Sequence, residues 1–178
     1  MQWYKYNIND LSADLYKKYY NLMTTERKSY VDSLKTEAAR KRTVAGELLV
    51  KSALKDDGIV ILKDEYGKPF IKGSDKYISI SHSNDYAVCA VSDSPVGIDI
   101  EIKREINLNT TRKFCNDTEL AYITANDSQN RFFEIWTAKE AAYKLIGGKE
   151  KSLINIDVFK YDRKYFNFSN YFLCIILY

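Results

Sequence analysis

The sequence predicts an α+β fold built in two successive blocks of strands and helices. Short stretches of alternating apolar and polar residues, typical of strands with one buried face, lie on both sides of longer helix-forming stretches. This arrangement occurs once before the break at Asp93-Ser94-Pro95 and once after it. We therefore expect two similar lobes, residues 1–94 and residues 95–178.

The first lobe combines short strands with one long helix. Residues 35–54 contain no proline and carry apolar residues at the spacing of a buried helix face. Asn9 or Asp10 can cap an earlier helix that runs to about residue 23, and Thr24 or Thr25 can cap a short helical turn. Strands are predicted over residues 1–8, 59–62, 70–72, 77–81 and 86–91.

The second lobe begins with V-G-I-D-I-E at residues 96–101, where isoleucines alternate with acidic residues as in a half-buried strand. The stretch W-T-A-K-E-A-A-Y-K at residues 136–144 is rich in helix formers. Helices are expected over residues 110–114, 117–125 and 129–145, and closing strands over residues 154–161 and 165–178.

Three carboxylates are candidates for a metal site. Asp99 and Glu101 point to the same side of their strand, roughly 6–7 Å apart. Two carboxylates on one face repel each other, and a divalent cation such as Mg²⁺ is their usual occupant. Glu140 adds a third carboxylate, and Lys139 and Lys144 add cations for a polyphosphate. Each piece alone also fits a solvated strand face or an ordinary surface ion pair on a helix.

Composition favours an ordinary globular protein. The net charge of +3 is too small to argue for nucleic acid or a membrane surface. The longest apolar run, residues 171–178, is too short to span a bilayer, and the first residues lack the apolar region of a signal peptide. Three dispersed cysteines without C-x-x-C, and a single histidine, argue against a zinc site. We expect no nucleic acid, no membrane, buried Cys89 and Cys174, and a reducing cytoplasm.

The ordered set of motifs resembles the 4'-phosphopantetheinyl transferases. V-G-I-D-I-E is followed by W-x-x-K-E-A-x-x-K, with R-K-F-C-N-D-T-E-L between them at residues 112–120. Upstream, E-Y-G-K-P-F at 65–70, S-I-S-H-S at 79–83 and R-x-T-x-A-G-E-L-L at 42–49 complete the family's order. In its length, the chain resembles the two-lobed Sfp-type class of this family. The resemblance implies a monomer with a pseudo-two-fold pair of lobes and coenzyme A in the cleft between them.

The resemblance also implies a reaction. Asp99, Glu101 and Glu140 match the family's Mg²⁺ ligands, and Lys144 would add a cation near the pyrophosphate of coenzyme A. A serine of an acyl- or peptidyl-carrier protein would attack, take the 4'-phosphopantetheine arm and release 3',5'-ADP. The base for that serine is either Glu140 or a water on the metal.

Five residues match the family's contacts to the nucleotide and phosphates of coenzyme A, and a sixth, Arg42, is adjacent to one of them. Cationic and hydroxyl groups suit this role because they form charge-assisted bonds to phosphate oxygens. One departure is Tyr30, which stands where a second basic residue is expected three positions after Arg27. This change is expected to weaken binding of the 3'-phosphate of coenzyme A unless Lys28 supplies the missing cation. The candidate residues for binding coenzyme A are therefore Arg27, Arg42, Thr43, Lys68, Ser81 and His82.

Two rival functions remain open. One is another Mg²⁺-dependent phosphoryl-transfer enzyme that uses the same carboxylates, and the other is a degenerate module that binds coenzyme A or a carrier protein. The sequence contains no P-loop, no G-x-G-x-x-G and no G-x-S-x-G.

The segment 112–125 is expected to receive the carrier protein, as the corresponding region does in the family. Phe114 and Leu120 are predicted to be core residues. The remaining apolar residues, Tyr122 and Ile123, are predicted to form a patch, with Arg112 and Lys113 at its rim.

Overall fold

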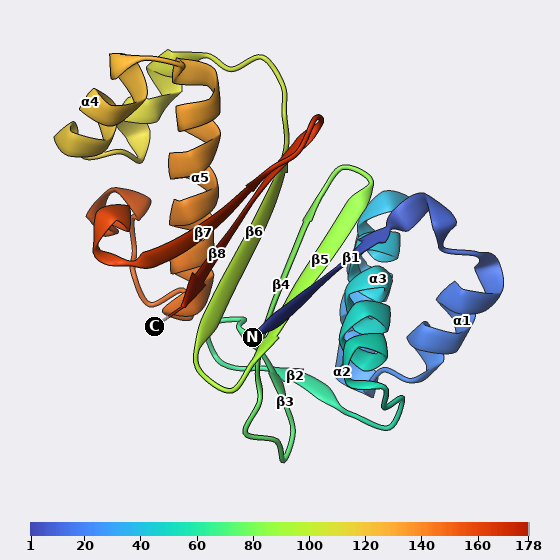
Figure 1. Ribbon diagram of the computed structural model, residues 1–178. Coiled ribbons are helices and arrows are strands. Elements are labelled where there is room, and N and C mark those ends of the chain that lie inside the picture. The colour runs from blue at the N-terminus through green and yellow to red at the C-terminus, as the bar shows by residue number, and fades with distance from the viewer. Residues whose placement is uncertain (178) are drawn as a thin grey trace.

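Two three-stranded antiparallel sheets form the centre of the computed structural model, which describes residues 1–177 (Figure 1). The first sheet has the order β1-β5-β4 and the second has the order β6-β8-β7. A short hairpin, β2-β3, precedes β4. The strands are β1 (Gln2–Asn7), β2 (Ile61–Lys63), β3 (Pro69–Ile71), β4 (Tyr77–Ser83), β5 (Tyr86–Ser92), β6 (Val96–Ile102), β7 (Asp162–Asn167) and β8 (Tyr171–Leu177).

Helices cover the outer faces of the sheets, so the predicted α+β class is confirmed (Figure 1). The long helix α3 packs on the first sheet, and the long helix α5 packs on the second. The α-helices are α1 (Ala13–Asn21), α2 (Thr25–Ser33), α3 (Glu37–Leu54), α4 (Asp117–Ala125) and α5 (Ser128–Leu145). Short 3-10 helices lie at Ile8–Asp10, Leu108–Lys113, Leu153–Asn155 and Val158–Lys160.

Gly97 explains how closely α5 approaches β6. A Cβ atom at this position would lie 1.9 Å from the carbonyl oxygen of Ala141, so only glycine fits. Ala141 and Ala142 of α5 are small and fully buried, which permits the same approach from the helix side. The polar residues of α5 are thereby brought next to the acidic residues of β6.

Serine side chains join the two sheets along the facing edges of β4 and β6. The backbone N–H of Ile98 donates to Ser79 Oγ at 3.1 Å, and that of Ile102 donates to Ser83 Oγ at 3.1 Å. These bonds replace a backbone ladder between β4 and β6, which belong to different sheets. The alternating serines of S-I-S-H-S therefore fix the position of β6 relative to β4.

The apolar core has three parts. One lies between α3 and the first sheet, and a second lies between α5 and the second sheet. The third is shared, because Val88 and Ala90 of β5 pack with Ile98 and Ile100 of β6 and with Leu173 of β8. The chain crosses from one sheet to the other at residues 93–95. A lobe boundary between residues 94 and 95, and pseudo-two-fold symmetry of the lobes, stay predictions.

The predicted strand over residues 154–161 is wrong. This segment forms the 3-10 helices Leu153–Asn155 and Val158–Lys160. Its backbone is engaged by side chains, since Lys139 Nζ donates to the carbonyls of Leu153 and Ile156 at 2.9 and 2.6 Å. The N–H of Val158 donates to Glu119 Oε1 at 3.1 Å. Groups that a strand would offer to a neighbour are therefore already paired.

Other element boundaries also differ from the predictions. The predicted strand over residues 165–178 is a hairpin of β7 and β8, and Tyr178 lies outside the described residues. The helix expected over residues 110–114 is the 3-10 helix Leu108–Lys113. The first α-helix begins after Ser12, whose Oγ accepts from the Leu15 N–H, and not after Asn9 or Asp10. Thr24 caps α2, as one of the two predicted alternatives has it.

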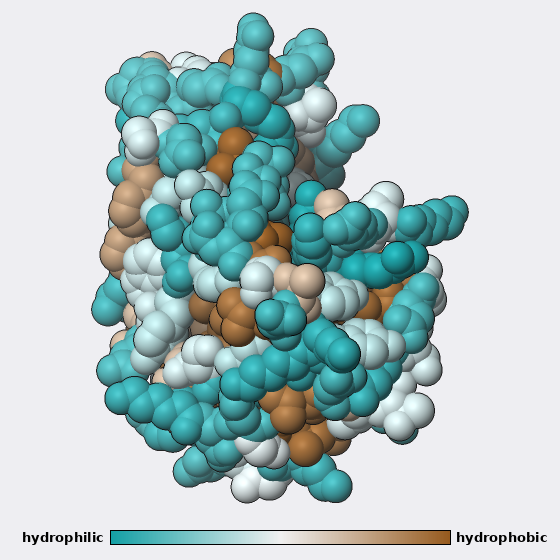
Figure 2. Space-filling model, turned by 90° about the vertical axis from the view of Figure 1, so that its right-hand side faces the viewer, coloured by the Kyte–Doolittle hydropathy of each residue, from teal (hydrophilic) through white to brown (hydrophobic). Residues whose placement is uncertain are grey.

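The surface on the α1 side is mostly hydrophilic, and its hydrophobic residues form only small scattered groups (Figure 2). Leu15, Leu22 and Tyr30 are among the large hydrophobic residues that the structure leaves exposed. No helix within residues 1–177 has the length and apolar character required to cross a membrane. The thiols of Cys89 and Cys174 are buried, as predicted.

Candidate active site

One face of α5 carries three polar side chains toward β6. Trp136, Glu140 and Lys144 are spaced by four residues and therefore share this face. They lie opposite Asp99 and Glu101, which alternate along β6 and share its α5-facing side with Gly97. The structure thus brings the three predicted carboxylates and Lys144 into one region.

Asp99 is the most deeply buried member of this group, at 4% exposure. Its Oδ1 accepts a hydrogen bond from Ser81 Oγ at 2.7 Å and one from Lys144 Nζ at 2.6 Å. Its Oδ2 is buried and has no hydrogen-bond partner within residues 1–177. Burial raises the pKa of Asp99, and Lys144 and Ser81 oppose that shift. A buried oxygen without a partner is costly and is suited to an added ligand.

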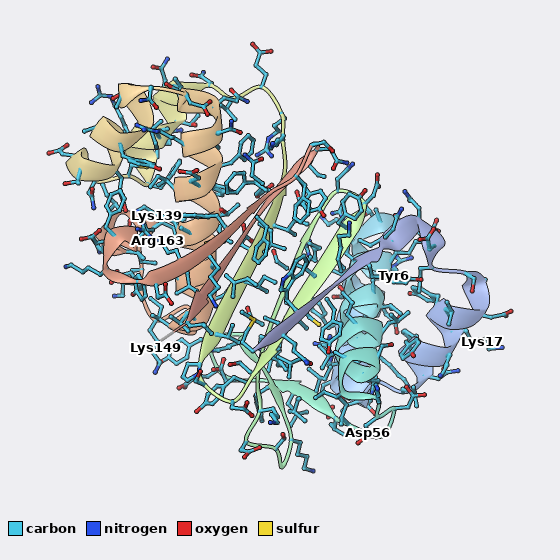
Figure 3. The ribbon with its side chains drawn as sticks, viewed as in Figure 1. Tyr6, Lys17, Asp56, Lys139, Lys149 and Arg163 are labelled. Atoms are coloured by element: carbon cyan, nitrogen blue, oxygen red, sulfur yellow. The ribbon has the colours of Figure 1, made fainter. Side chains whose placement is uncertain are left out.

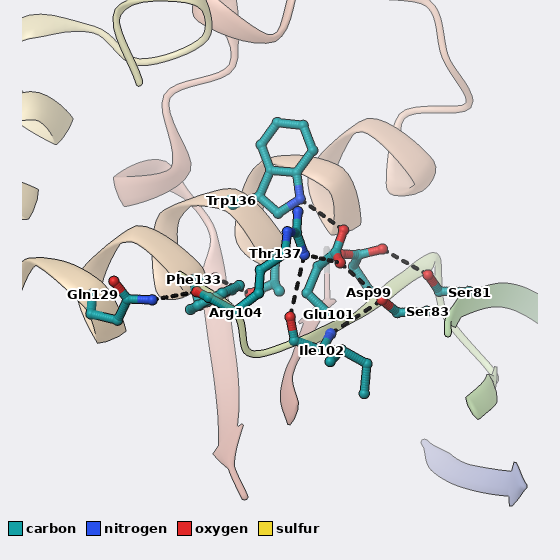
Figure 4. A network of polar contacts seen from close by, with 10 residues as sticks. All are labelled: Ser81, Ser83, Asp99, Glu101, Ile102, Arg104, Gln129, Phe133, Trp136 and Thr137. Carbon is teal, nitrogen blue, oxygen red and sulfur yellow. Dashed lines mark hydrogen bonds and ion pairs between the residues drawn. The ribbon is translucent and has the colours of Figure 1, made fainter. Parts of the chain in front are cut away.

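Glu101 is held at both oxygens (Figure 4). Trp136 Nε1 donates to Oε1 at 2.9 Å, and Ser83 Oγ donates to Oε2 at 2.9 Å. Arg104 on the exposed side contacts Oε2 at 3.3 Å. The Glu101 carboxylate therefore has a fixed orientation beside α5.

Glu140 lies near Asp99 and Glu101, and their negative charges shift the pKa of its carboxyl group. Burial raises its pKa first, Asp99 raises it further and Glu101 adds a smaller increase, while Lys144 opposes them. Three carboxylates that repel one another lower their energy by binding a cation. Together with the unpartnered Asp99 Oδ2, this repulsion means that the residues fit a hard divalent ion.

The side chains do not already surround a common point. Within residues 1–177, no three His, Cys, Asp or Glu side chains converge closely enough to hold an ion. Lys144 bonds Asp99 Oδ1, and Trp136 and Ser83 hold Glu101. An ion bound by all three carboxylates would require these side chains to turn toward one another.

A cavity of about 240 Å³ adjoins the carboxylates. Its walls come from α2, α3, the β2–β3 hairpin, β4 and the C-terminal end of α5. No Asp or Glu occurs among its described lining residues, so its charge is strongly positive. The basic side chains that line it are Arg27, Arg42, Lys63, Lys68 and Lys144, beside His82 and Thr43.

His82 lies in this cavity, on the side of β4 away from the serine contacts to β6. Its side chain keeps access to solvent, yet the surrounding walls desolvate it and lower its pKa below 6.5. A backbone hydrogen bond and, more weakly, Glu101 raise the pKa, whereas Lys144 and Arg42 lower it further. The imidazole is therefore neutral near pH 7, and an anion in the cavity would favour its protonated form.

Arg27 and Lys68 are anchored inside the protein. Arg27 Nε lies 3.3 Å from the buried Glu47 carboxylate. Lys68 Nζ donates to the carbonyl of Leu145 at 2.6 Å, where the last carbonyls of α5 carry partial negative charge. Both side chains still line the cavity.

Known proteins share part of this sequence. The sequence pattern of the 4'-phosphopantetheinyl transferase superfamily matches residues 95–170, which contain β6, α5 and all three carboxylates. The part of the chain that contains β6 and α5 is therefore similar to the 4'-phosphopantetheinyl transferase superfamily.

Three relatives with this name illustrate the extent of the similarity. The chain is 39% identical to the 4'-phosphopantetheinyl transferase gsp of Aneurinibacillus migulanus over 115 residues, which are 60% of this chain and 48% of that protein. It is 29% identical to Sfp of Bacillus subtilis strain 168 over 152 residues, 80% and 68% of the two chains. It is 30% identical to AcpT of Escherichia coli strain K12 over 125 residues, 66% and 64%. The match to gsp thus spans about half of that relative's length.

The structure places most of the residues that the transferase resemblance suggested in two adjoining groups. Asp99, Glu101, Glu140 and Lys144 form the acidic group with its lysine, and Arg27, Arg42, Thr43, Lys68 and His82 line the cavity. Ser81 differs from the prediction, because its hydroxyl bonds Asp99 and Lys144 and it is not among the lining residues.

Two predicted cations lie elsewhere. Lys139 is fully buried on another side of α5, between that helix and the 153–156 segment (Figure 3). It contacts Glu119, and not the polyphosphate region, so its inclusion in the site was wrong. Lys28 Nζ lies over the ring of Tyr20 at 5.8 Å and does not line the cavity, so it does not replace the missing basic residue.

The segment predicted to meet a carrier protein is partly different from expectation. Phe114 is a core residue, as predicted, and Leu120 is partly buried against the core. Ile123 was predicted to be a surface residue but is 1% exposed. Arg112 and Lys113 are exposed at the end of a 3-10 helix.

Sequence reasoning missed Trp136, Ser83 and Lys63. The first two carried a signal: Trp136 lies one turn before Glu140, and Ser83 continues the alternation of Ser79 and Ser81. Lys63 carried none, because its place in the cavity depends on how the β2–β3 hairpin folds over α2.

Proposed function

We propose that this protein transfers the 4'-phosphopantetheine arm of coenzyme A to a serine of an acyl- or peptidyl-carrier protein, with release of 3',5'-ADP. The observation that carries the proposal is the position of Lys144. It bonds Asp99 in the acidic group and also lines the basic cavity. A carboxylate group next to a cationic cavity suits a substrate whose pyrophosphate lies between them.

Asp99, Glu101 and Glu140 would hold Mg²⁺. The ion would supply charge stabilisation to the pyrophosphate and the departing 3',5'-ADP. Lys144, released from Asp99, would donate to a pyrophosphate oxygen. Glu140, or a water held by the metal, would accept the proton of the serine.

The basic cavity would bind the nucleotide end of coenzyme A. Arg27, Arg42 and Lys68 present cations to it, and His82 would gain a proton as phosphate enters. Ser81 would act as a positioning residue, since it orients Asp99 and Lys144 through its hydroxyl.

The proposed partners are a carrier protein and coenzyme A, for a monomer in the cytoplasm. Exposed Arg112 and Lys113 support a carrier protein with an acidic surface. The three buried free thiols suit a reducing compartment.

Mass spectrometry tests this function. Purified apo acyl- and peptidyl-carrier proteins are incubated with the protein, coenzyme A and Mg²⁺, and each carrier is weighed. We expect a gain of one phosphopantetheine arm on at least one carrier, and no gain in the presence of a chelator. Asp99→Ala should abolish the gain, whereas Asp93→Ala, at a surface ion pair with Lys76, should not.

The same assay separates the rival functions. Release of nucleotide without a change in carrier mass would indicate another phosphoryl-transfer enzyme. Binding of coenzyme A without any product would indicate a binding module. Either outcome over a broad set of carriers would overturn the proposed transfer.

A further inference from the structure

Lys63 differs from the other basic residues whose contacts in the cavity have been described. Arg27 pairs with Glu47, Lys68 donates to Leu145, and Lys144 pairs with Asp99. Within residues 1–177, the Lys63 ammonium instead contacts the aromatic ring of Tyr30. Its Nζ lies 4.7 Å from the centre of that ring. Lys63 thus contributes a charge to the cavity without a carboxylate partner.

The surroundings of Lys63 favour an anion. The cavity walls lower its pKa by desolvation, and the charge of Arg27 lowers it further. Two cations that face one cavity without an intervening carboxylate repel each other, and a bound anion removes that repulsion. A phosphomonoester is well suited, because its two negative charges can accept from both side chains.

Tyr30 explains how Lys63 reaches this position. Tyr30 lies three residues after Arg27 on α2, so the two side chains share one face of the helix. The Tyr30 ring contacts the Lys63 ammonium through a cation–π interaction. Tyr30 therefore holds a lysine from β2 beside Arg27, because Lys28, the second cation of α2, does not line the cavity.

The geometry points to Lys63 as a phosphate-binding and specificity-determining residue, which forms with Arg27 a two-cation clamp for a terminal phosphomonoester and is positioned by Tyr30. The assignment of that group to the 3'-phosphate of coenzyme A rests on the proposed function. It predicts that discrimination between nucleotides with and without this phosphate depends on Lys63.

Calorimetric titration with nucleotides alone tests the clamp without metal or carrier protein. 3',5'-ADP carries the phosphomonoester and 5'-AMP lacks it. We expect Lys63→Gln to weaken 3',5'-ADP binding roughly tenfold, as loss of a charge-assisted hydrogen bond does, and to change 5'-AMP binding by less than about twofold. Lys63→Arg should retain most of the discrimination. Lys72→Gln, at an exposed lysine beyond β3, is the matched control.

The role of Tyr30 is tested in the same way. Tyr30→Phe keeps the ring and should preserve binding, whereas Tyr30→Leu should weaken 3',5'-ADP binding a few-fold. In the Lys63→Gln background Tyr30→Leu should add little, because both changes act on one contact. Thermal unfolding of each variant checks that the fold is retained.

The outcomes separate this inference from the proposed function. If the wild-type protein prefers 3',5'-ADP but Lys63→Gln keeps that preference, the clamp is wrong and the proposed function stands. Equal losses for both nucleotides would also exclude a phosphomonoester contact at Lys63. If the wild-type protein does not distinguish the two nucleotides, both the clamp and the proposed coenzyme A site are overturned.

Discussion

Lys139 and Lys144 lie five positions apart on the same helix and belong to one sequence motif, but their environments are opposite. Lys139 is fully buried, and its three N–H groups have three fixed acceptors: Glu119 at 2.7 Å and the carbonyls of Leu153 and Ile156. Lys144 keeps 27% side-chain exposure and shares Asp99 with Ser81 at the edge of a cavity. The first lysine is saturated, whereas the second can exchange its partner.

The partners of the two lysines differ in the same way. Glu119 accepts from the backbone of Asn116 and Val158 as well as from Lys139, so its oxygens are fully engaged. Asp99 retains one buried oxygen that has no partner in the part of the chain that the structure describes. A saturated ion pair holds a fold together, and an unsaturated one leaves capacity for a ligand. We therefore expect substitutions at the two pairs to affect different properties.

The largest effect should follow from Lys139→Met, on stability. This change leaves the Glu119 carboxylate buried without its cation, which typically costs about 3–5 kcal/mol. Chemical denaturation measures the free energy of unfolding. The surface pair Glu37–Lys41 provides the control, and Lys41→Met should cost less than about 1 kcal/mol. A similar small cost for Lys139→Met would show that the buried pair does not stabilise the fold.

Lys144→Met should have the second largest effect, on transfer. Removal of a cation that stabilises developing charge typically lowers the rate about 100-fold or more. The free energy of unfolding should change much less than in Lys139→Met, since Ser81 still bonds Asp99 and the site is open to solvent. Turnover with saturating coenzyme A and carrier measures the rate. Normal turnover with strongly reduced stability would reverse the roles that we assign to the two lysines.

This difference between the lysines also marks the limit of prediction from sequence. Alternation in V-G-I-D-I-E and helical spacing in 136–144 are local patterns, and both elements were predicted correctly. The role of Lys139 could not be read locally, because its acceptors at Leu153 and Ile156 lie on a later segment. The same long-range bonds engage the backbone of residues 153–156. This explains why 154–161 forms 3-10 helices and not the predicted strand.

The site shows the same limit. Asp99, Glu101 and Glu140 follow from spacing and family resemblance, and the structure brings them near one another. Lys63 and the Ser81–Asp99 contact depend on where β2 and β4 lie relative to α2 and β6. Each contact joins two elements that are far apart in the sequence, so the fold is needed to show that the two side chains meet.

A third, smaller effect concerns the charge of His82 in the basic cavity. It is the single histidine of the chain, so its NMR signals need no assignment. The cavity walls, Lys144 and Arg42 place its pKa below 6.5 in the free protein. Addition of 3',5'-ADP should raise this pKa, because the phosphate favours the protonated ring. An unchanged titration curve at saturating nucleotide would remove His82 from the phosphate site.

The same pKa predicts a stability change with its sign. Because the folded pKa is lower than 6.5, the unfolded chain binds more protons in this range. Stability should therefore decrease as the pH falls from about 6.5 through the folded-state pKa, and His82→Gln should remove this component.

The smallest expected effect concerns the exposed pair Arg112 and Lys113, which lies outside both ion-pair regions. Charge reversal at both positions should reduce kcat/KM for an acidic carrier protein several-fold, because it removes long-range attraction. The reduction should shrink at high salt, and nucleotide binding should not change. Lys17→Glu with Lys35→Glu makes the same change in net charge at exposed positions of the other half and is the matched control. Equal losses in the two double variants would indicate a general charge effect, and a normal rate at low ionic strength would exclude this surface from carrier docking.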